Sequence, residues 1–320
     1  MINNAWDDHF IAALYEKYPK RSQLIQVLTD LLCLEREAVY RRLRKDVSFS
    51  IHEIVKVSSE WNISLDKISA INSGQILFMM QPMNYLNPSE EELKYLQRII
   101  DALNHFKDFP KTEFLDVCNK LPRQLLAGYP YLNQFHLFKC NYQYGENSKV
   151  IPFSQTIVSK EKAELDANYY NAIKMVPNSY FIWDRLIFSN LINDIYYFHS
   201  IHLITDEEKE LIKKDMSELL NYILDVANKG CYPETGNKVN LYISQLNIDT
   251  SYSYTFTPEA NICFIHVFDK YEFYTYNSEM VEKFRNWMQL KKRTSMQISE
   301  VDERSRIDFF SKQQQLVDKL

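Results

Sequence analysis

The stretch LTDLLCLEREAVYRRLRK, residues 28–45, decides how the N-terminal part of this chain folds. Leu28, Leu31 and Leu32 continue an apolar stripe at helical spacing, and a second helical pattern follows within a few residues. Residues 36–45 carry five cationic side chains and one carboxylate, although the whole chain has a formal net charge of -5. This cluster is either the solvated face of a short helix or a surface that meets a polyanion.

The bulk composition restricts the class of protein. A chain of 320 residues exceeds the usual size of one hydrophobic core, which favours two domains. It contains only 5 glycines and neither a G-x-G-x-x-G nor a G-x-x-x-x-G-K-[ST] motif, which argues against Rossmann-type and nucleotide-hydrolysing enzymes. The five cysteines are scattered and show no C-x-x-C spacing, so we expect reduced thiols, no metal site and no cofactor. The N-terminus does not resemble a signal peptide, and charged residues interrupt the most apolar stretch. We therefore expect a soluble, cytoplasmic protein that does not enter a membrane.

The first 72 residues are expected to form an all-α domain. Short helical patterns follow one another, and Ser50 with Glu53 forms an S-x-x-E capping box that predicts where the fourth helix begins. Ser64 is the expected cap of a fifth, short helix. Residues 73–88 contain a glycine and two prolines and are expected to form a linker, with a short strand over residues 76–80 that docks onto the second domain.

Residues 89–320 are expected to form a larger α+β domain. Capping boxes at Ser89 and Thr205 open two helices, Gly230 ends the second, and helical patterns dominate as far as residue 229, including 111–128 and the aromatic segment from Ser179. From residue 238 the period changes to two, which predicts four consecutive strands in an antiparallel meander, with a hairpin turn at residues 269–270. Ser278 is expected to cap the first of the C-terminal helices.

Residues 28–68 have the spacing of a helix-turn-helix, in which two helices are joined by a turn of three or four residues. Leu34 would fill the turn, while Val39 and Leu43 would anchor the second helix. With the supporting segment FSIHEIVKVSSEWNIS, this part resembles the lambda-repressor-like (Cro-type) DNA-binding domain over residues 6–71. Two positions depart from the family: Cys33 stands where glycine is usual in the turn, and Thr29 stands where a small alanine is usual.

The resemblance implies a role for eight residues. Four would approach base edges in the major groove: Arg36, Glu37, Tyr40 and Arg41. Four others would contact phosphates: Arg44, Lys45, Lys20 and Arg21. The alternative that the residues leave open is a small helical bundle with one solvated basic face.

For three further patterns we favour a structural role over a binding site. His199 and His202 lie three residues apart in an apolar helix and are expected to be hydrogen-bonded rather than metal-bound. The basic residues of 282–295 are expected to form the solvent-exposed face of an amphipathic helix. Aromatic runs at 169–170, 180–183 and 196–198 are expected to be mainly core, with a ligand pocket as the alternative.

Together these observations predict a bacterial-type transcription regulator whose partners are double-stranded DNA and a second copy of the chain. The C-terminal domain would bind a small-molecule or protein effector, or mediate dimerisation through the helix from Ser278, and no catalytic activity is expected. The alternative from another class is a protein-interaction module whose helical bundle docks a protein and not DNA. A third interpretation is an enzyme whose active site lies in the C-terminal domain. A steep salt dependence of binding would separate the first two.

Overall fold

The computed structural model describes residues 5–61, 63–65, 68, 76–82, 88–145, 150–258, 261–267 and 271–320. The chain divides into two compact units, Met1–Leu77 (unit 1) and Phe78–Leu320 (unit 2). Three sequence expectations fall wholly or largely outside the described residues: the turn at 269–270, most of the fifth helix that Ser64 would cap, and much of the linker over 73–88.

Unit 1 contains four helices in its described part: α1 (Ala5–Lys17), α2 (Arg21–Leu32), α3 (Arg36–Leu43) and α4 (Ile51–Trp61). Their apolar stripes meet in one core, whose centre consists of fully buried side chains such as Phe10, Leu28 and Val57. The predicted capping box at the start of α4 is confirmed. Glu53 N donates to Ser50 Oγ at 3.3 Å, and Ser50 N donates to Glu53 Oε2 at 2.8 Å.

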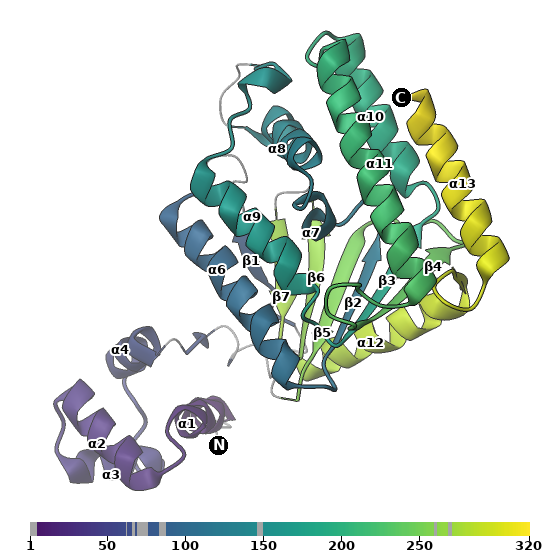
Figure 1. The fold of residues 1–320 in the computed structure, drawn as a ribbon. Coiled ribbons are helices and arrows are strands. Elements are labelled where there is room, and N and C mark those ends of the chain that lie inside the picture. The colour runs from purple at the N-terminus through teal and green to yellow at the C-terminus, as the bar shows by residue number, and fades with distance from the viewer. Residues whose placement is uncertain are drawn as a thin grey trace. The chain divides into compact units, whose positions relative to one another are not determined.

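Unit 2 is a mixed α/β structure around an eight-stranded sheet (Figure 1). Its strands are β1 (Met79–Pro82), β2 (Glu113–Cys118), β3 (Asn178–Asp184), β4 (Lys238–Ser244), β5 (Ser251–Phe256), β6 (Asn261–Val267), β7 (Tyr271–Thr275) and β8 (Ser295–Gln297). They lie in the order β1-β7-β6-β5-β2-β3-β4-β8. The strands β2, β3 and β4 are parallel, and every other pairing in the sheet is antiparallel.

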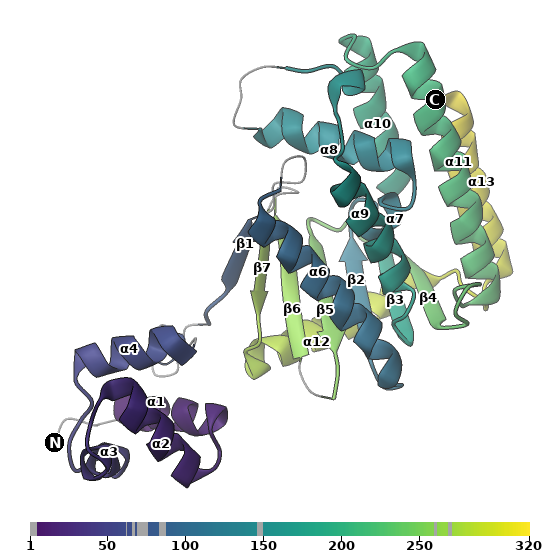
Figure 2. The same cartoon turned by 60° about the vertical axis from the view of Figure 1, so that its left-hand side comes forward.

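Helices cover both faces of this sheet, as Figures 1 and 2 show. One face carries α6 (Glu90–His105), α7 (Arg123–Leu126), α8 (Pro130–Tyr144), α9 (Lys160–Ile173), α10 (Ile187–Ser200), α11 (Asp206–Lys229) and α13 (Glu303–Lys319). The other face carries α12 (Ser278–Arg293), whose Val281, Phe284 and Met288 are buried against Leu115 and Ile182. Two short 3-10 turns, Phe106–Asp108 and Phe153–Gln155, complete the connections.

The structure corrects three expectations for unit 2. Residues 113–118 and 178–184 are strands and not parts of helices, because central strands covered on both faces lack the alternation that identifies a strand. The predicted four-strand meander is also wrong: β5, β6 and β7 form one, but β4 lies parallel to β3. The helix that begins at Ser278 is capped by Asn277, whose side chain accepts from Met280 N at 3.0 Å.

Other local expectations for unit 2 are confirmed. Ser89 and Thr205 each form a complete capping box, and Gly230 ends α11 in the left-handed conformation at φ 65°. The strand expected near residues 76–80 is β1, which pairs with β7 in antiparallel register. Within the described residues, no helix combines the length and apolarity that crossing a membrane requires.

Candidate functional site

The segment that joins α2 to α3 has a geometry set by Cys33. This residue caps α2 in the left-handed conformation, at φ 53° and ψ 43°, and its backbone N–H donates to Thr29 O. A glycine adopts this conformation without strain, whereas a β-carbon makes it unfavourable by roughly 1–2 kcal/mol. Cys33 therefore holds this turn in a strained conformation. Thr29 Oγ1, in the same segment, is buried and has no hydrogen-bond partner among the described residues.

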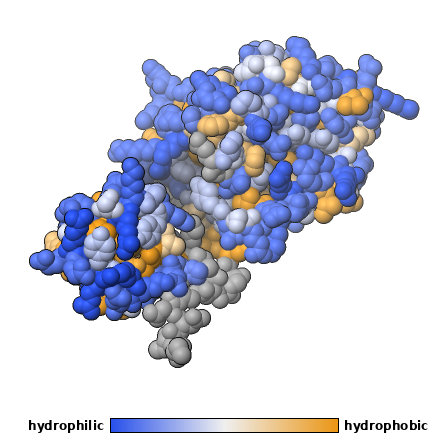
Figure 3. Space-filling model, turned by 90° about the horizontal axis from the view of Figure 1, so that it is seen from below, coloured by the Kyte–Doolittle hydropathy of each residue, from blue (hydrophilic) through white to orange (hydrophobic). Residues whose placement is uncertain are grey.

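Helix α3 has one buried and one exposed face. Val39 and Leu43 are buried in the core of unit 1, whereas Arg36, Glu37 and Arg41 are exposed. Neither Arg36 nor Arg41 forms an ion pair with any residue that the structure describes. Both guanidinium groups are therefore available for a partner. On the face of the molecule shown in Figure 3, hydrophilic side chains cover much of the lobe that contains α1–α4.

Tyr40 extends this exposed face towards the start of α2. The ring is half-buried, and the guanidinium carbon of Arg21 lies 5.3 Å from its centroid. This cation–π contact fixes the direction of both side chains while leaving the guanidinium charge exposed to solvent. Lys20, which precedes Arg21, is also exposed.

The remaining predicted phosphate contacts are engaged with carboxylates of unit 1. Arg44 lies 3.3 Å from both Glu37 Oε1 and Asp46 Oδ2, and Lys45 pairs with Asp8. The exposed ends of these side chains mean that each pair adds little stability. Arg44 and Lys45 would nevertheless have to exchange these partners before they could contact a polyanion.

Arg42, the one basic residue of the cluster without a predicted contact, lies on the inner side of α3. Its Nε and Nη2 donate to the two carboxylate oxygens of Glu53 at 2.9 and 2.8 Å. Burial of the Glu53 carboxyl opposes ionisation, but the hydrogen bonds from Arg42 and from the Ser50 backbone outweigh it and lower the pKa of Glu53. Arg42 therefore joins α3 to α4 and is not available for binding.

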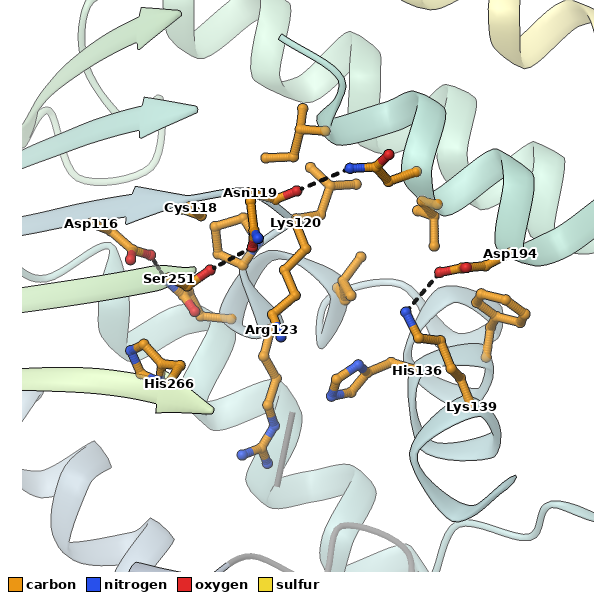
Figure 4. A pocket seen from close by; sticks show the side chains of 18 of the residues that line it. Asp116, Cys118, Asn119, Lys120, Arg123, His136, Lys139, Asp194, Ser251 and His266 are labelled. Carbon is orange, nitrogen blue, oxygen red and sulfur yellow. Dashed lines mark hydrogen bonds and ion pairs between the residues drawn. The ribbon is translucent and has the colours of Figure 1, made fainter. Parts of the chain in front are cut away.

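A second candidate site lies in unit 2, at the carboxyl end of β2. A cavity of about 290 Å³ is lined by the loop after β2, by α7, α8, α9 and α10, and by the facing ends of β5, β6 and β7. Figure 4 shows Lys120 crossing the middle of this cleft, with His136 and Lys139 of α8 on one side and Asp116 and His266 on the other. The carboxyl ends of parallel strands are where ligands commonly bind in α/β sheets.

His266 on the strand side of the cleft is held by two neighbours. Its Nε2 lies 2.9 Å from Ser253 Oγ, and its Nδ1 lies 3.7 Å from Glu272 Oε1. This serine, histidine and glutamate set comes from three adjacent strands and was not visible in the sequence. Ser253 is 5% exposed and does not line the cavity, so it orients the ring rather than meeting a ligand.

The remaining histidine and aromatic candidates have mainly structural roles. His199 lies 2.9 Å from Asp206 Oδ1, and no group of three metal-binding side chains occurs among the described residues. Of the aromatic runs, Phe181, Trp183 and Phe198 are core, whereas Tyr169 lines the cleft.

No protein-family model, curated protein or solved structure matches this chain.

Proposed function

We propose that this protein is a sequence-specific DNA-binding transcription regulator in which α3 enters the major groove. The observation that carries the proposal is the pair Arg36 and Arg41, which are exposed on the outer face of α3 and free of ion pairs with described residues. A short turn with a left-handed residue at Cys33 connects this helix to α2, as in helix-turn-helix proteins.

The proposal gives the exposed residues two kinds of role. Arg36 and Arg41 would donate bidentate hydrogen bonds to guanine, and Tyr40 and Glu37 would contact neighbouring bases. Lys20 and Arg21, at the start of α2, would contact phosphates. Arg44 and Lys45 would add less, because each must leave a carboxylate of unit 1 before contacting the backbone.

A second copy of the chain completes this mechanism. One helix-turn-helix covers a single half-site, and specific operators commonly place two half-sites about 34 Å apart. Unit 2 would hold the two copies and respond to an effector. The apolar face of α12, our sequence candidate for the dimer contact, packs on the sheet, so any contact through α12 would use its outer face.

The test is binding of the full chain to duplex DNA over a salt series. The wild type is compared with the double variant Arg36→Ala/Arg41→Ala and with Arg293→Ala/Arg304→Ala, which removes two exposed arginines of unit 2. We expect the first variant to lose at least tenfold in affinity and part of the salt slope, while the control behaves as wild type. If both variants bind DNA as the wild type does, α3 is not the DNA-binding element.

A protein-interaction module is the second candidate, and one observation favours it. Ile51 is 81% exposed and Val55 is 48% exposed, one turn apart on α4. They form a small exposed apolar pair, and exposed apolar surface is what a protein partner would cover. Binding of a protein here would depend little on salt, and Ile51→Ser/Val55→Ser would weaken it without affecting DNA binding.

A further inference from the structure

Most of the charged side chains around the cleft of unit 2 are paired with one another. Of the charged side chains that the structure describes in the lining, Asp116 of β2 and Lys120 of the following loop belong to none of these pairs. Both have contacts of their own, since Asp116 accepts from Gln124 at 3.1 Å and Lys120 keeps an interaction within the protein. The three pairs are Lys139 with Asp194, Arg123 with Asp166, and His266 with Glu272.

The directions in which the pKa values move distinguish Asp116 and Lys120 from a well-paired group. Burial of Asp166 opposes its ionisation, but its two cationic partners outweigh burial and lower the pKa. For Asp116, burial outweighs the neighbouring groups and raises the pKa. Burial, followed by repulsion from Lys139, lowers the pKa of Lys120 to about 8. The contacts of Asp116 and Lys120 thus compensate their charges incompletely, and an opposite charge beside either group would be stabilised.

Asp116 and Lys120 enter the same cavity from different directions. Figure 4 shows the Asp116 carboxyl on the strand side and the Lys120 side chain crossing the middle of the cleft. Apolar side chains from α8 and α10 also line the cavity, among them Phe135, Ile187 and Leu191. A ligand in this cavity would therefore meet a carboxylate, an ammonium group and an apolar surface at once.

We propose that this cleft binds a small zwitterion of the amino-acid type, with its ammonium group at Asp116, its carboxylate at Lys120 and an apolar side chain against Phe135 and Leu191. A ligand with a single charge would compensate only one of the two buried groups. Because a carboxylate accepts up to about four hydrogen bonds and an ammonium group donates three, both residues can keep their present contacts. The volume, about 290 Å³, lies at the lower end of the range for small-molecule pockets, which suits an amino acid and not a dinucleotide.

The proposal goes beyond DNA binding, and its test contains no DNA. Binding of L-leucine, L-methionine and L-phenylalanine to the full chain is measured by calorimetry and by the rise in melting temperature. For leucine, 4-methylpentanoate lacks the ammonium group, 3-methylbutylamine lacks the carboxylate, and glycine lacks the apolar side chain. We expect at least one apolar amino acid to bind, and leucine to bind roughly tenfold or more tightly than each of its three analogues.

Matched variants locate the two charged contacts. Asp116→Asn and Lys120→Gln each remove one charge from the cleft, whereas Asp308→Asn and Lys312→Gln each remove one from an exposed pair on α13. We expect Asp116→Asn to abolish most of the preference for leucine over 4-methylpentanoate, because the ammonium group then has no carboxylate to meet. Lys120→Gln should likewise abolish most of the preference over 3-methylbutylamine, and the two control variants should leave both preferences unchanged.

The wild type supplies a measurement that does not depend on the folding of any variant. His136 and His266 both line the cavity, and Figure 4 shows them on opposite sides of Lys120. A bound amino acid should therefore shift at least one of their imidazole NMR signals. The proposal is overturned if no apolar amino acid binds, if an analogue binds as tightly as leucine, if both preferences persist in the folded cleft variants, or if the bound amino acid leaves both imidazole signals unmoved.

Discussion

Arg42 and Glu53 join α3 to α4 through two hydrogen bonds, and the same carboxylate also completes the capping box with Ser50. Glu53 thus fixes the start of α4 and the orientation of α3 at once. Side-chain exposures of 16% and 13% show that this pair is mostly shielded from water. A bidentate pair that is shielded from water contributes more stability than the exposed pairs of Arg44 and Lys45.

We predict that Arg42→Ala destabilises unit 1 by about 1.5–3 kcal/mol, because it leaves the Glu53 carboxylate partly buried without its main donor. Arg44→Ala is the matched control and should change the stability by about 0.5 kcal/mol or less, since its pairs are exposed. Thermal or denaturant unfolding followed through the NMR methyl signals of Val39 reports on unit 1 within the full chain. Equal losses in the two variants would mean that the Arg42–Glu53 pair has no special role.

The same pair predicts a pH dependence of stability. The pKa of Glu53 is lowered in the folded state, so its contribution is fully present above the ordinary glutamate value of about 4.5 and is lost as the pH falls through the folded value. The stability difference between the wild type and Glu53→Gln should therefore be constant from pH 7 to pH 5 and shrink below it. Unfolding followed through the Val39 methyl signals measures this stability difference at each pH. A difference that grows as the pH falls would contradict the assigned direction.

Cys33 gives a prediction in the opposite direction, towards greater stability. Cys33→Gly removes the β-carbon from a left-handed residue and should stabilise unit 1 by about 0.5–1 kcal/mol, whereas Cys33→Val should destabilise it, because a β-branched residue is strained there. The Cys33 side chain is exposed, so little packing changes in either variant. Unfolding curves of the two variants that fall in the reverse order would show that the turn is not held in this conformation in solution.

Sequence predicted those parts of the fold that depend on local chemistry. The capping boxes at Ser50, Ser89 and Thr205 depend on side chains three residues apart, and the strands β5–β7 show alternation. The strands β2 and β3 could not be recognised in the same way. In β3, Phe181 packs towards the helices while Ile182 packs towards α12, so both faces of the strand are apolar and the period of two disappears.

The two candidate sites differ in how far the sequence predicts them, for the same reason. The exposed residues of α3 lie within one short segment, so their spacing alone identifies them. The residues of the cleft come from distant segments, with Asp116 on β2, His136 on α8 and His266 on β6. The pairing of β2 with β5, and of β5 with β6, brings Asp116 and His266 together, and the packing of α8 brings His136 to the same cavity. No sequence pattern connects residues 116, 136 and 266.

The buried carboxylate of Asp166 holds a cluster of two cations, Arg123 and Lys162, beside the cleft, and it carries the last prediction. Asp166 is fully buried, and it accepts hydrogen bonds from Arg123, Lys162 and Asn133. Asp166→Asn leaves two cations in a shielded position without their carboxylate and should destabilise unit 2 by about 3–5 kcal/mol. Lys162→Met should cost less, about 1–3 kcal/mol, because Asp166 keeps Arg123 and Asn133 while methionine, an unbranched side chain of similar length, fills the space of the lysine. Calorimetric unfolding of the full chain compares the two variants. If Lys162→Met is the more damaging of the two, the lysine and not the carboxylate organises this cluster.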